Sequence, residues 1–469
     1  MSNSLSNSDF DENFFFKKIN WKKLYKVLII IQSRIVKHVE KKNFRKVRDL
    51  QRLLMKSFAA RIIVSQKIIK IKKTKKYSNY IRKKNQLLRN ENIIDFINNI
   101  DLENIQKYTI PTLNSTFFKL IYLLWVLALL PILETQSWQF SYNYRIFRNH
   151  HDFIYQLVKI FTKINANWIF IIKINGFFCC ENIDWLFKNL IIEKKFLKLY
   201  LKSNIFSTSI NQKNIYSNKY FMETKISMNK ILQSFSLQAE ANHFENHFDP
   251  FYFQSGLVKT PIFLYNNLII IPSKNCNQFT KIQTILRNFY KKRGLIVRKK
   301  RSWKIDLNKG FNFLGWNLKK KHKKVILNIN HYNIKAHRFE IKRLLALTGT
   351  QPIDKVIDKL NEKIIYWQYY YSYASNCHQT WSKMNSYIFW RIWKWCKKRN
   401  KNKGSKWIYE RYWIKQNTQN WVFSVNNHSL VSYYIRKQKI TLLPGSLNVF
   451  KLKNYKTVYN IQTKKKLFF

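Results

Sequence analysis

The longest apolar run in the chain, Leu120 to Leu133, is 14 residues long and contains Pro131. A helix that crosses a bilayer needs roughly 20 apolar residues. A shorter run is typical of a helix buried in a globular core. We therefore expect no membrane partner. The chain has 469 residues, of which 46% are hydrophobic, so two or three domains with a sizeable core are expected.

The second constraint is charge, because 86 Lys and Arg against 24 Asp and Glu give a net charge of +62. A compact protein with this charge repels itself unless a polyanion neutralises it. Nucleic acid is the first candidate partner and a membrane surface is the second. Scarce Gly (8) and Pro (7) are typical of an AT-rich genome, where lysine accumulates through codon drift. Drift alone does not account for the rarity of acids.

Five cysteines stand at positions 179, 180, 276, 377 and 396, and none forms a CxxC pair. This spacing indicates neither a zinc ribbon nor a disulfide framework, and it favours a reducing compartment. The N-terminus has early acids and no apolar run before a cleavage site, so we expect no secretory or transit peptide. With the AT-rich composition, this favours synthesis inside an organelle.

Residues 1–20 are expected to form a loose tail, and residues 21–70 two helices. In the second helix, Phe44, Val47, Leu50 and Leu54 recur at helical spacing and form an apolar stripe. The adjacent stripe is cationic and consists of Lys41, Arg45, Arg48 and Arg52. A solvated charged face is the alternative to RNA contact there.

Further along, residues 72–105 are expected to form loops and fingers. Residues 168–178 (WIFIIKINGFF) predict a buried strand that ends at Gly176. Residues 261–271 predict a hairpin that turns at Asn266-Asn267. A helix is expected over 278–292 with Gly294 as its C-cap, then a hairpin over 303–320, a helical region over 352–415, and short strands after residue 430.

Four stretches, read in order, resemble the reverse transcriptase maturases of group II introns. They are VRDLQRLLMKSFAARII at 47–63, TIPTL at 109–113 with LLPILETQSWQFSYNYR at 129–145, GFNFLGW at 310–316, and LNEKIIYWQYYYSYAS at 360–375 with WIYERYW at 407–413. The composition is similar to that of the maturase-like plastid proteins of euglenoid algae, whose hosts carry group II and group III introns.

The resemblance implies an α+β fold of the right-hand type, with degenerate fingers and palm on an antiparallel sheet and a helical thumb. The implied domains are a tail over 1–20, a helical extension over 21–105, fingers and palm over 106–325, a thumb or maturase domain over 326–430, and a basic C-terminal tail over 431–469.

The resemblance also locates a lost catalytic site. Polymerases hold two Mg²⁺ ions with carboxylates on adjacent strands. The position of the family's first aspartate is Lys173, and its paired aspartates correspond to Asn266 and Asn267. No acid stands between Asp152 and Glu181, or between Asp249 and Asp306, so a shifted alignment does not restore the site. We predict no reverse transcriptase activity and no cofactor.

One other cluster has metal-binding residue types, in HFENHFD at 243–249. His243 and His247 would share a face of a helix. The alternative is a polar surface segment, and we predict no metal site.

The predicted RNA-binding surface lies in residues 383–413, where basic side chains neutralise phosphates and aromatic faces stack on unpaired bases. Its candidates are Arg391, Lys394, Lys397, Lys398, Arg399, Lys401, Lys403, Lys406 and Arg411. The residues expected to face the other way are Ile388, Ile392 and Trp395. The neighbouring rings of Trp367, Tyr369, Tyr370, Trp390 and Trp393 are interpreted mainly as core.

The predicted function is an RNA-binding splicing factor that assists excision of group II or group III introns, while the RNA performs the chemistry. The partners are intron RNA and, as an open class, other splicing proteins. The alternatives are a general basic RNA-binding protein, a residually active reverse transcriptase, and a membrane protein. The predicted compartment is the plastid, with the mitochondrion as alternative.

Overall fold

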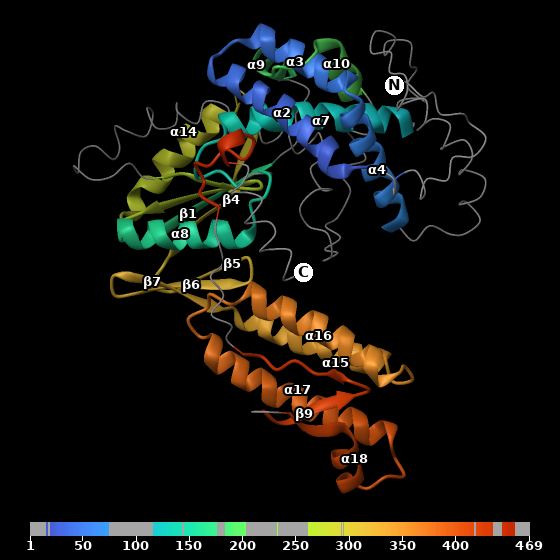
Figure 1. Ribbon diagram of the computed structural model, residues 1–469. Helices are drawn as coiled ribbons and strands as arrows, with labels where there is room; N and C mark the ends of the chain where they lie inside the picture. The colour runs from blue at the N-terminus through green and yellow to red at the C-terminus, as the bar shows by residue number, and fades with distance from the viewer. Residues whose placement is uncertain are drawn as a thin grey trace.

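The computed structural model describes residues 16, 19–74, 116–142, 145–175, 183–202, 232, 261–291, 293, 295–416, 419–434 and 443–454. Figure 1 shows an N-terminal helical layer, a central sheet with its helices, and a C-terminal helical layer. Helices and small antiparallel sheets confirm the predicted α+β class. The assignment of these layers to fingers, palm and thumb stays a prediction, as do the domain bounds.

The N-terminal layer consists of α2 (Trp21–Glu40), α3 (Phe44–Lys56), α4 (Phe58–Thr74), α7 (Thr116–Gln136), α9 (Ile183–Asn189) and α10 (Lys194–Lys202). The prediction of two helices over residues 21–70 is wrong, because there are three. Lys42 has a left-handed φ of 54°, and the Asn43 side chain then caps α3. A second break follows at Ser57, whose backbone is extended.

The apolar run lies within α7 and is largely buried, as predicted. Pro131 has no N–H to donate to the carbonyl of Leu127, four residues earlier. Gln32 of α2 donates its Nε2 to that carbonyl at 2.9 Å, so the broken helical hydrogen bond is replaced from a neighbouring helix. Within the described ranges, no helix is long and apolar enough to span a membrane.

The central sheet has the order β2-β3-β1-β4, with β1 (Trp168–Asn175), β2 (Phe263–Tyr265), β3 (Leu268–Ser273) and β4 (Ile296–Asp306). The predicted strand and the predicted Asn-Asn hairpin are confirmed. On one face of the sheet lies α8 (His150–Ile164), and on the other α14 (Phe279–Lys291), which follows η5 (Cys276–Gln278). The helix predicted over 278–292 is confirmed as α14, while Gly176 and Gly294 lie outside the described residues.

A second sheet is formed by β5 (Phe311–Phe313), β6 (Trp316–Lys321) and β7 (Lys324–Ile329). The hairpin predicted over 303–320 is wrong in its first part. Residues up to Asp306 pair with β1 in the central sheet, and the hairpin begins only after Gly310, whose φ is 93°. Residues 303–306, which the local sequence pattern assigned to the hairpin, therefore belong to β4 and pair with the distant strand β1.

The C-terminal layer contains α15 (His331–Leu347), α16 (Ile353–Tyr370), α17 (Cys377–Arg399) and α18 (Ser405–Tyr412), with β8 (Trp413–Gln416), β9 (Gln419–Val425) and β10 (His428–Ser429). The predicted helical region is confirmed. Residues 443–454 return to the N-terminal layer, where Leu443, Val449 and Phe450 join its core. The stretch predicted as a basic tail thus includes a packed segment.

Candidate nucleic-acid interface

The central sheet brings the three predicted lost-metal positions together. Lys173 pairs with Leu268, directly after the turn of Asn266 and Asn267. The amide of Ile174 donates to the carbonyl of Asn267 at 2.8 Å, which fixes β1 against this turn. Asn266 is exposed and has a φ of 51°, a conformation that asparagine tolerates. The three positions that the sequence alignment assigned to the metal site therefore lie next to one another in the fold.

These residues do not fit a pair of magnesium ions. The four strands of the central sheet hold a single acid, Asp306, which pairs with Trp168. That position is five residues along β1 from Lys173, or roughly 16 Å. In the part of the chain that the structure describes, no group of three or more His, Cys, Asp or Glu is arranged to hold a metal. His243 and His247 lie outside that part. Amides and an ammonium do not replace carboxylates as Mg²⁺ ligands.

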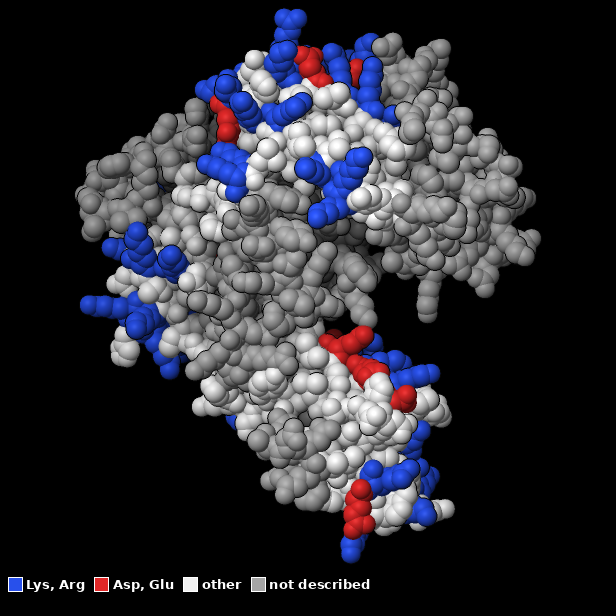
Figure 2. All heavy atoms as spheres, in the orientation of Figure 1, with Lys and Arg blue, Asp and Glu red and all other residues white. Residues whose placement is uncertain are grey.

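The basic stripe on the N-terminal layer is exposed along its whole length, as expected. Lys41, Arg45, Arg48 and Arg52 are all solvent-exposed, and Figure 2 shows blue side chains gathered over this layer. The ion pair of Arg52 with Asp49 is long, at 3.8 Å, and exposed. A pair of this kind binds weakly and leaves the guanidinium available to a phosphate. The apolar stripe differs from prediction at Phe44, which is 42% exposed because it opens α3 beside the break.

On α17, the basic and apolar faces separate as the spacing predicts. Ile388 and Ile392 are buried, while Lys394 and Lys398 are exposed. Arg391 is half-buried, and its Nε donates to the Tyr387 hydroxyl at 3.1 Å. The lysines of this face are therefore more accessible than Arg391.

Cations of α17 and of the loop that leads to α18 lie over aromatic rings. The Nζ of Lys397 is 5.3 Å from the Trp393 ring, and that of Lys403 is 5.4 Å from the Trp407 ring. Such contacts hold a flexible ammonium near the surface while leaving it hydrated. The remaining exposed candidates are Lys401, Lys406 and Arg411.

Arg399 has a structural role that the sequence did not indicate. Its Nη1 donates to the carbonyls of Gly349 and Gln351, at 3.2 and 2.6 Å, and the guanidinium lies 5.2 Å from the Trp395 ring. These contacts tie the end of α17 to the connection between α15 and α16. Arg399 is thus less free to meet RNA than the neighbouring Lys397 and Lys398.

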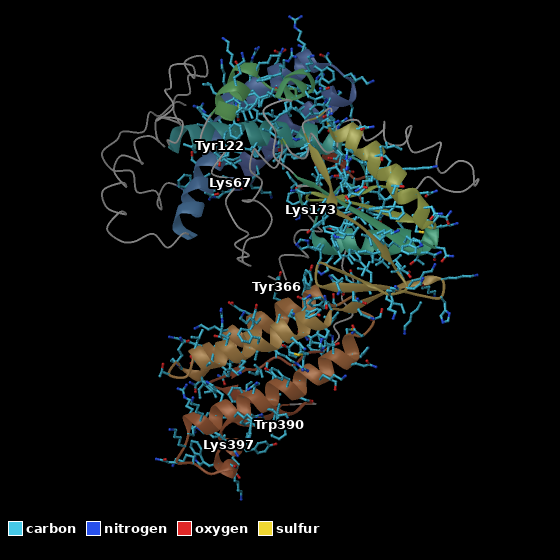
Figure 3. All side chains as sticks on the ribbon, turned by 180° about the vertical axis from the view of Figure 1, so that it is seen from behind. Lys67, Tyr122, Lys173, Tyr366, Trp390 and Lys397 are labelled. Atoms are coloured by element: carbon cyan, nitrogen blue, oxygen red, sulfur yellow. The ribbon has the colours of Figure 1, made fainter. Side chains whose placement is uncertain are left out.

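The aromatic residues of this region are mainly core, as interpreted from sequence, with one clear exception. Trp367 and Tyr369 are buried, whereas Trp390 is 58% exposed on α17. An exposed indole beside exposed lysines has the form of a stacking surface for an unpaired base. Figure 3 shows Trp390 and Lys397 near the far end of the C-terminal layer.

A further cationic surface, which the sequence patterns above did not predict, lies on the second sheet. The β6–β7 turn has the sequence KKKHKK at 319–324, and Lys319, Lys321, Lys323 and Lys324 are exposed. Figure 2 shows this group at the left of the molecule. Lys320 differs, because its Nζ donates to the Asn167 side chain. The run of five lysines, interrupted by His322, was the available signal.

Two family models match the chain, one in its N-terminal helical layer and one in its C-terminal helical layer. Residues 334–413 match the maturase-specific domain of group II introns, and residues 16–90 match the N-terminal domain of reverse transcriptase. The first segment holds most of α15 and all of α16, α17 and α18, and the second holds α2 to α4. Both basic surfaces predicted from sequence therefore lie within matched segments.

The chain is also similar to a curated protein, the ribosomal operon-associated A protein of Euglena longa. The two are 26% identical over 273 residues, which cover 56% of this chain and 46% of that protein. This chain thus spans about half the length of the relative. The resemblance to group II intron maturases and to euglenoid maturase-like proteins is confirmed by these matches.

Proposed function

We propose that this chain, which resembles the reverse transcriptase maturases of group II introns at its N-terminal and maturase-specific segments, is an RNA-binding splicing factor. It grips the folded intron RNA and stabilises the active arrangement of that RNA. The intron itself carries out the transesterification. The RNA that it binds is a group II or group III intron, and the compartment in which it acts is the plastid.

The observation that carries this proposal is the position of exposed cations within the matched segment 334–413. Lys394, Lys397 and Lys398 are exposed on one helix, and Trp390 is exposed beside them. Folded RNA brings phosphates close together, so it is stabilised by cations held in fixed positions. Each lysine–phosphate contact releases counterions, which makes the binding depend on salt.

The proposal includes the absence of reverse transcriptase activity. Lys173, Asn266 and Asn267 stand together where a polymerase of this family needs carboxylates. A lysine there repels Mg²⁺, and the sheet offers no acid within reach. Templated DNA synthesis by the purified chain would contradict this part of the proposal.

The test compares binding of a transcribed euglenoid plastid group II intron with binding of an unrelated structured RNA of equal length. The variant Lys397→Gln/Lys398→Gln removes two exposed charges from α17. The matched control, Lys159→Gln/Lys163→Gln, removes two exposed charges from α8. We expect the α17 variant to flatten the salt dependence by about 1.4 in log–log slope, at about 0.7 per contact, and the control to leave it unchanged. Equal affinity of the wild type for both RNAs would favour a general basic RNA-binding protein.

A further inference from the structure

The outward face of α15 carries large aromatic side chains that are strongly exposed. The helix packs against α16 and α17 through a buried stripe of His337, Ile341 and Leu345. On the opposite side, Tyr332 is 73% exposed and Phe339 is 64% exposed. These two rings are two helical turns apart, so they lie in line and about 10 Å from each other along the helix axis. A surface helix ordinarily carries polar residues opposite its buried stripe.

The same face of α15 is cationic. Arg343 is exposed one turn beyond the second ring, and Lys335 and Lys342 are exposed beside the line of rings. Within the described ranges, none of these three cations has an ion-pair partner. The acid of α15, Glu340, pairs with Lys363 of α16 at 2.8 Å. The outward face therefore combines exposed rings with a net positive charge.

Tyr387 joins α15 to the basic face of α17. Its hydroxyl donates to the carbonyl of Arg338 at 3.0 Å and accepts from the Nε of Arg391 at 3.1 Å. The Arg338 guanidinium also lies 5.0 Å from the centre of the same ring. Lys335 and Lys342 are three and four residues from Arg338, so they lie on the flank of α15 that is nearest α17. The two basic faces are therefore continuous across the C-terminal layer, in which both helices lie (Figure 1).

We propose that the outward face of α15 binds an unpaired segment of RNA. Tyr332 and Phe339 each stack on one base, and the cations of this face contact the phosphates. Aromatic faces stack on any base that is splayed out, whereas a duplex keeps its bases inside, so a single strand fits this face better than a duplex. This inference rests on the proposed function and deepens it, because it assigns the recognition of unpaired nucleotides to α15.

The charge of the face favours RNA over a second copy of the chain. Two copies that met through this face would bring like charges together, and such a juxtaposition is costly. The net charge of +62 adds repulsion between any two copies. A single strand of RNA meets neither cost, and it gains free energy from the counterions that its phosphates release.

The test measures binding of the full chain to a short polyuridylate strand and to a blunt RNA duplex of the same length. We expect Phe339→Ala to weaken binding of the single strand about 5-fold or more, as the loss of stacking on one base implies, and to leave duplex binding and the salt slope unchanged. Phe339→Tyr keeps a ring and should bind as the wild type does. Arg343→Gln should reduce the log–log salt slope by about 0.7. The matched control is Tyr155→Ala, which removes an exposed ring from α8 and should change neither affinity.

Unchanged single-strand affinity in a folded Phe339→Ala variant, or an equal loss for strand and duplex, would overturn the inference and leave the proposed function intact. Failure of the wild type to bind the intron transcript would instead overturn the proposed function. Should the alanine variant not fold, ultraviolet crosslinking of the wild type to polyuridylate decides. An adduct on Tyr332 or Phe339 supports the inference, and adducts confined to other peptides contradict it. Self-association of the protein without RNA, if Phe339→Ala abolishes it, would assign the face to a second copy and also contradict the inference.

Discussion

The buried carboxylate of Glu134 should be the most sensitive point in the packing of residues 443–454. Its two oxygens accept hydrogen bonds from Arg145, at 2.7 Å from Nη2 and 3.0 Å from Nε. Arg148 approaches the same carboxylate at 3.5 Å, and all three side chains are at most 2% exposed. The two arginines also donate to the carbonyls of Gly445 and Leu447, at 2.8 and 2.7 Å. Glu134 is therefore the direct ion-pair partner of both arginines that hold the returning segment.

Glu134→Gln keeps the shape of the side chain and removes its charge. Guanidinium groups remain charged in proteins, so the variant removes the ion-pair partner of two buried cations. Burial already lowers the pKa of Arg148, and Glu134 opposes that effect. Breaking a buried ion pair by removing one partner costs about 3–5 kcal/mol. That is a large part of the 5–15 kcal/mol that is typical of folded proteins.

The assay combines urea unfolding with hydrogen exchange of the amides in residues 443–450. Glu134→Gln should lower the free energy of unfolding and speed exchange at Leu443, whose amide donates to Asp152. The matched control is Glu40→Gln, which removes the ion pair with Lys451 in the same segment. That pair is 42% and 33% exposed, so its loss should cost less than about 1 kcal/mol. Equal effects of the two substitutions would show that the buried ion pairs of Glu134 do not hold this segment.

Three further predictions follow from other parts of the fold. Burial lowers the pKa of His337 to about 4, whereas in the unfolded chain this side chain takes up a proton near pH 6.5. The free energy of unfolding should therefore fall as the pH drops from 6.5 towards 4. In acid unfolding measurements, His337→Gln should reduce that loss. Gly315 has a φ of 85°, and an added Cβ would meet the Tyr371 hydroxyl. Gly315→Ala should therefore lower the free energy of unfolding by at least about 1 kcal/mol, which a thermal melt would register as a lower melting temperature. Asp358 raises the pKa of His428 through a hydrogen bond, so an NMR titration should place this pKa above the ordinary value for histidine, and Asp358→Asn should lower it.

Local patterns predicted the elements that depend on local chemistry. The β1 strand, the Asn-Asn hairpin and the 14-residue core helix all follow from runs of apolar residues bounded by turn residues. The faces of α17 follow from helical spacing, because its core contacts repeat at Ile388 and Ile392.

The errors arose where distant contacts decide the outcome. Residues 303–306 pair with β1, more than 130 positions earlier in the chain, and no local signal distinguishes this from the adjacent hairpin. The role of Arg399 depends on carbonyls 48 and 50 residues away. The packing of residues 443–454 depends on two arginines about 300 positions earlier. The excess of basic residues in the sequence predicted a cationic surface. The fold was needed to distinguish Arg399, which is bound to carbonyls, from exposed lysines such as Lys397 and Lys398.

We propose that this chain binds intron RNA and does not synthesise DNA. Crosslinking this protein to RNA within the organelle, followed by sequencing of the attached RNA, tests it most directly. We expect enrichment of group II or group III intron sequences over all other transcripts. Recovery of ribosomal RNA alone, with introns at background level, would contradict it.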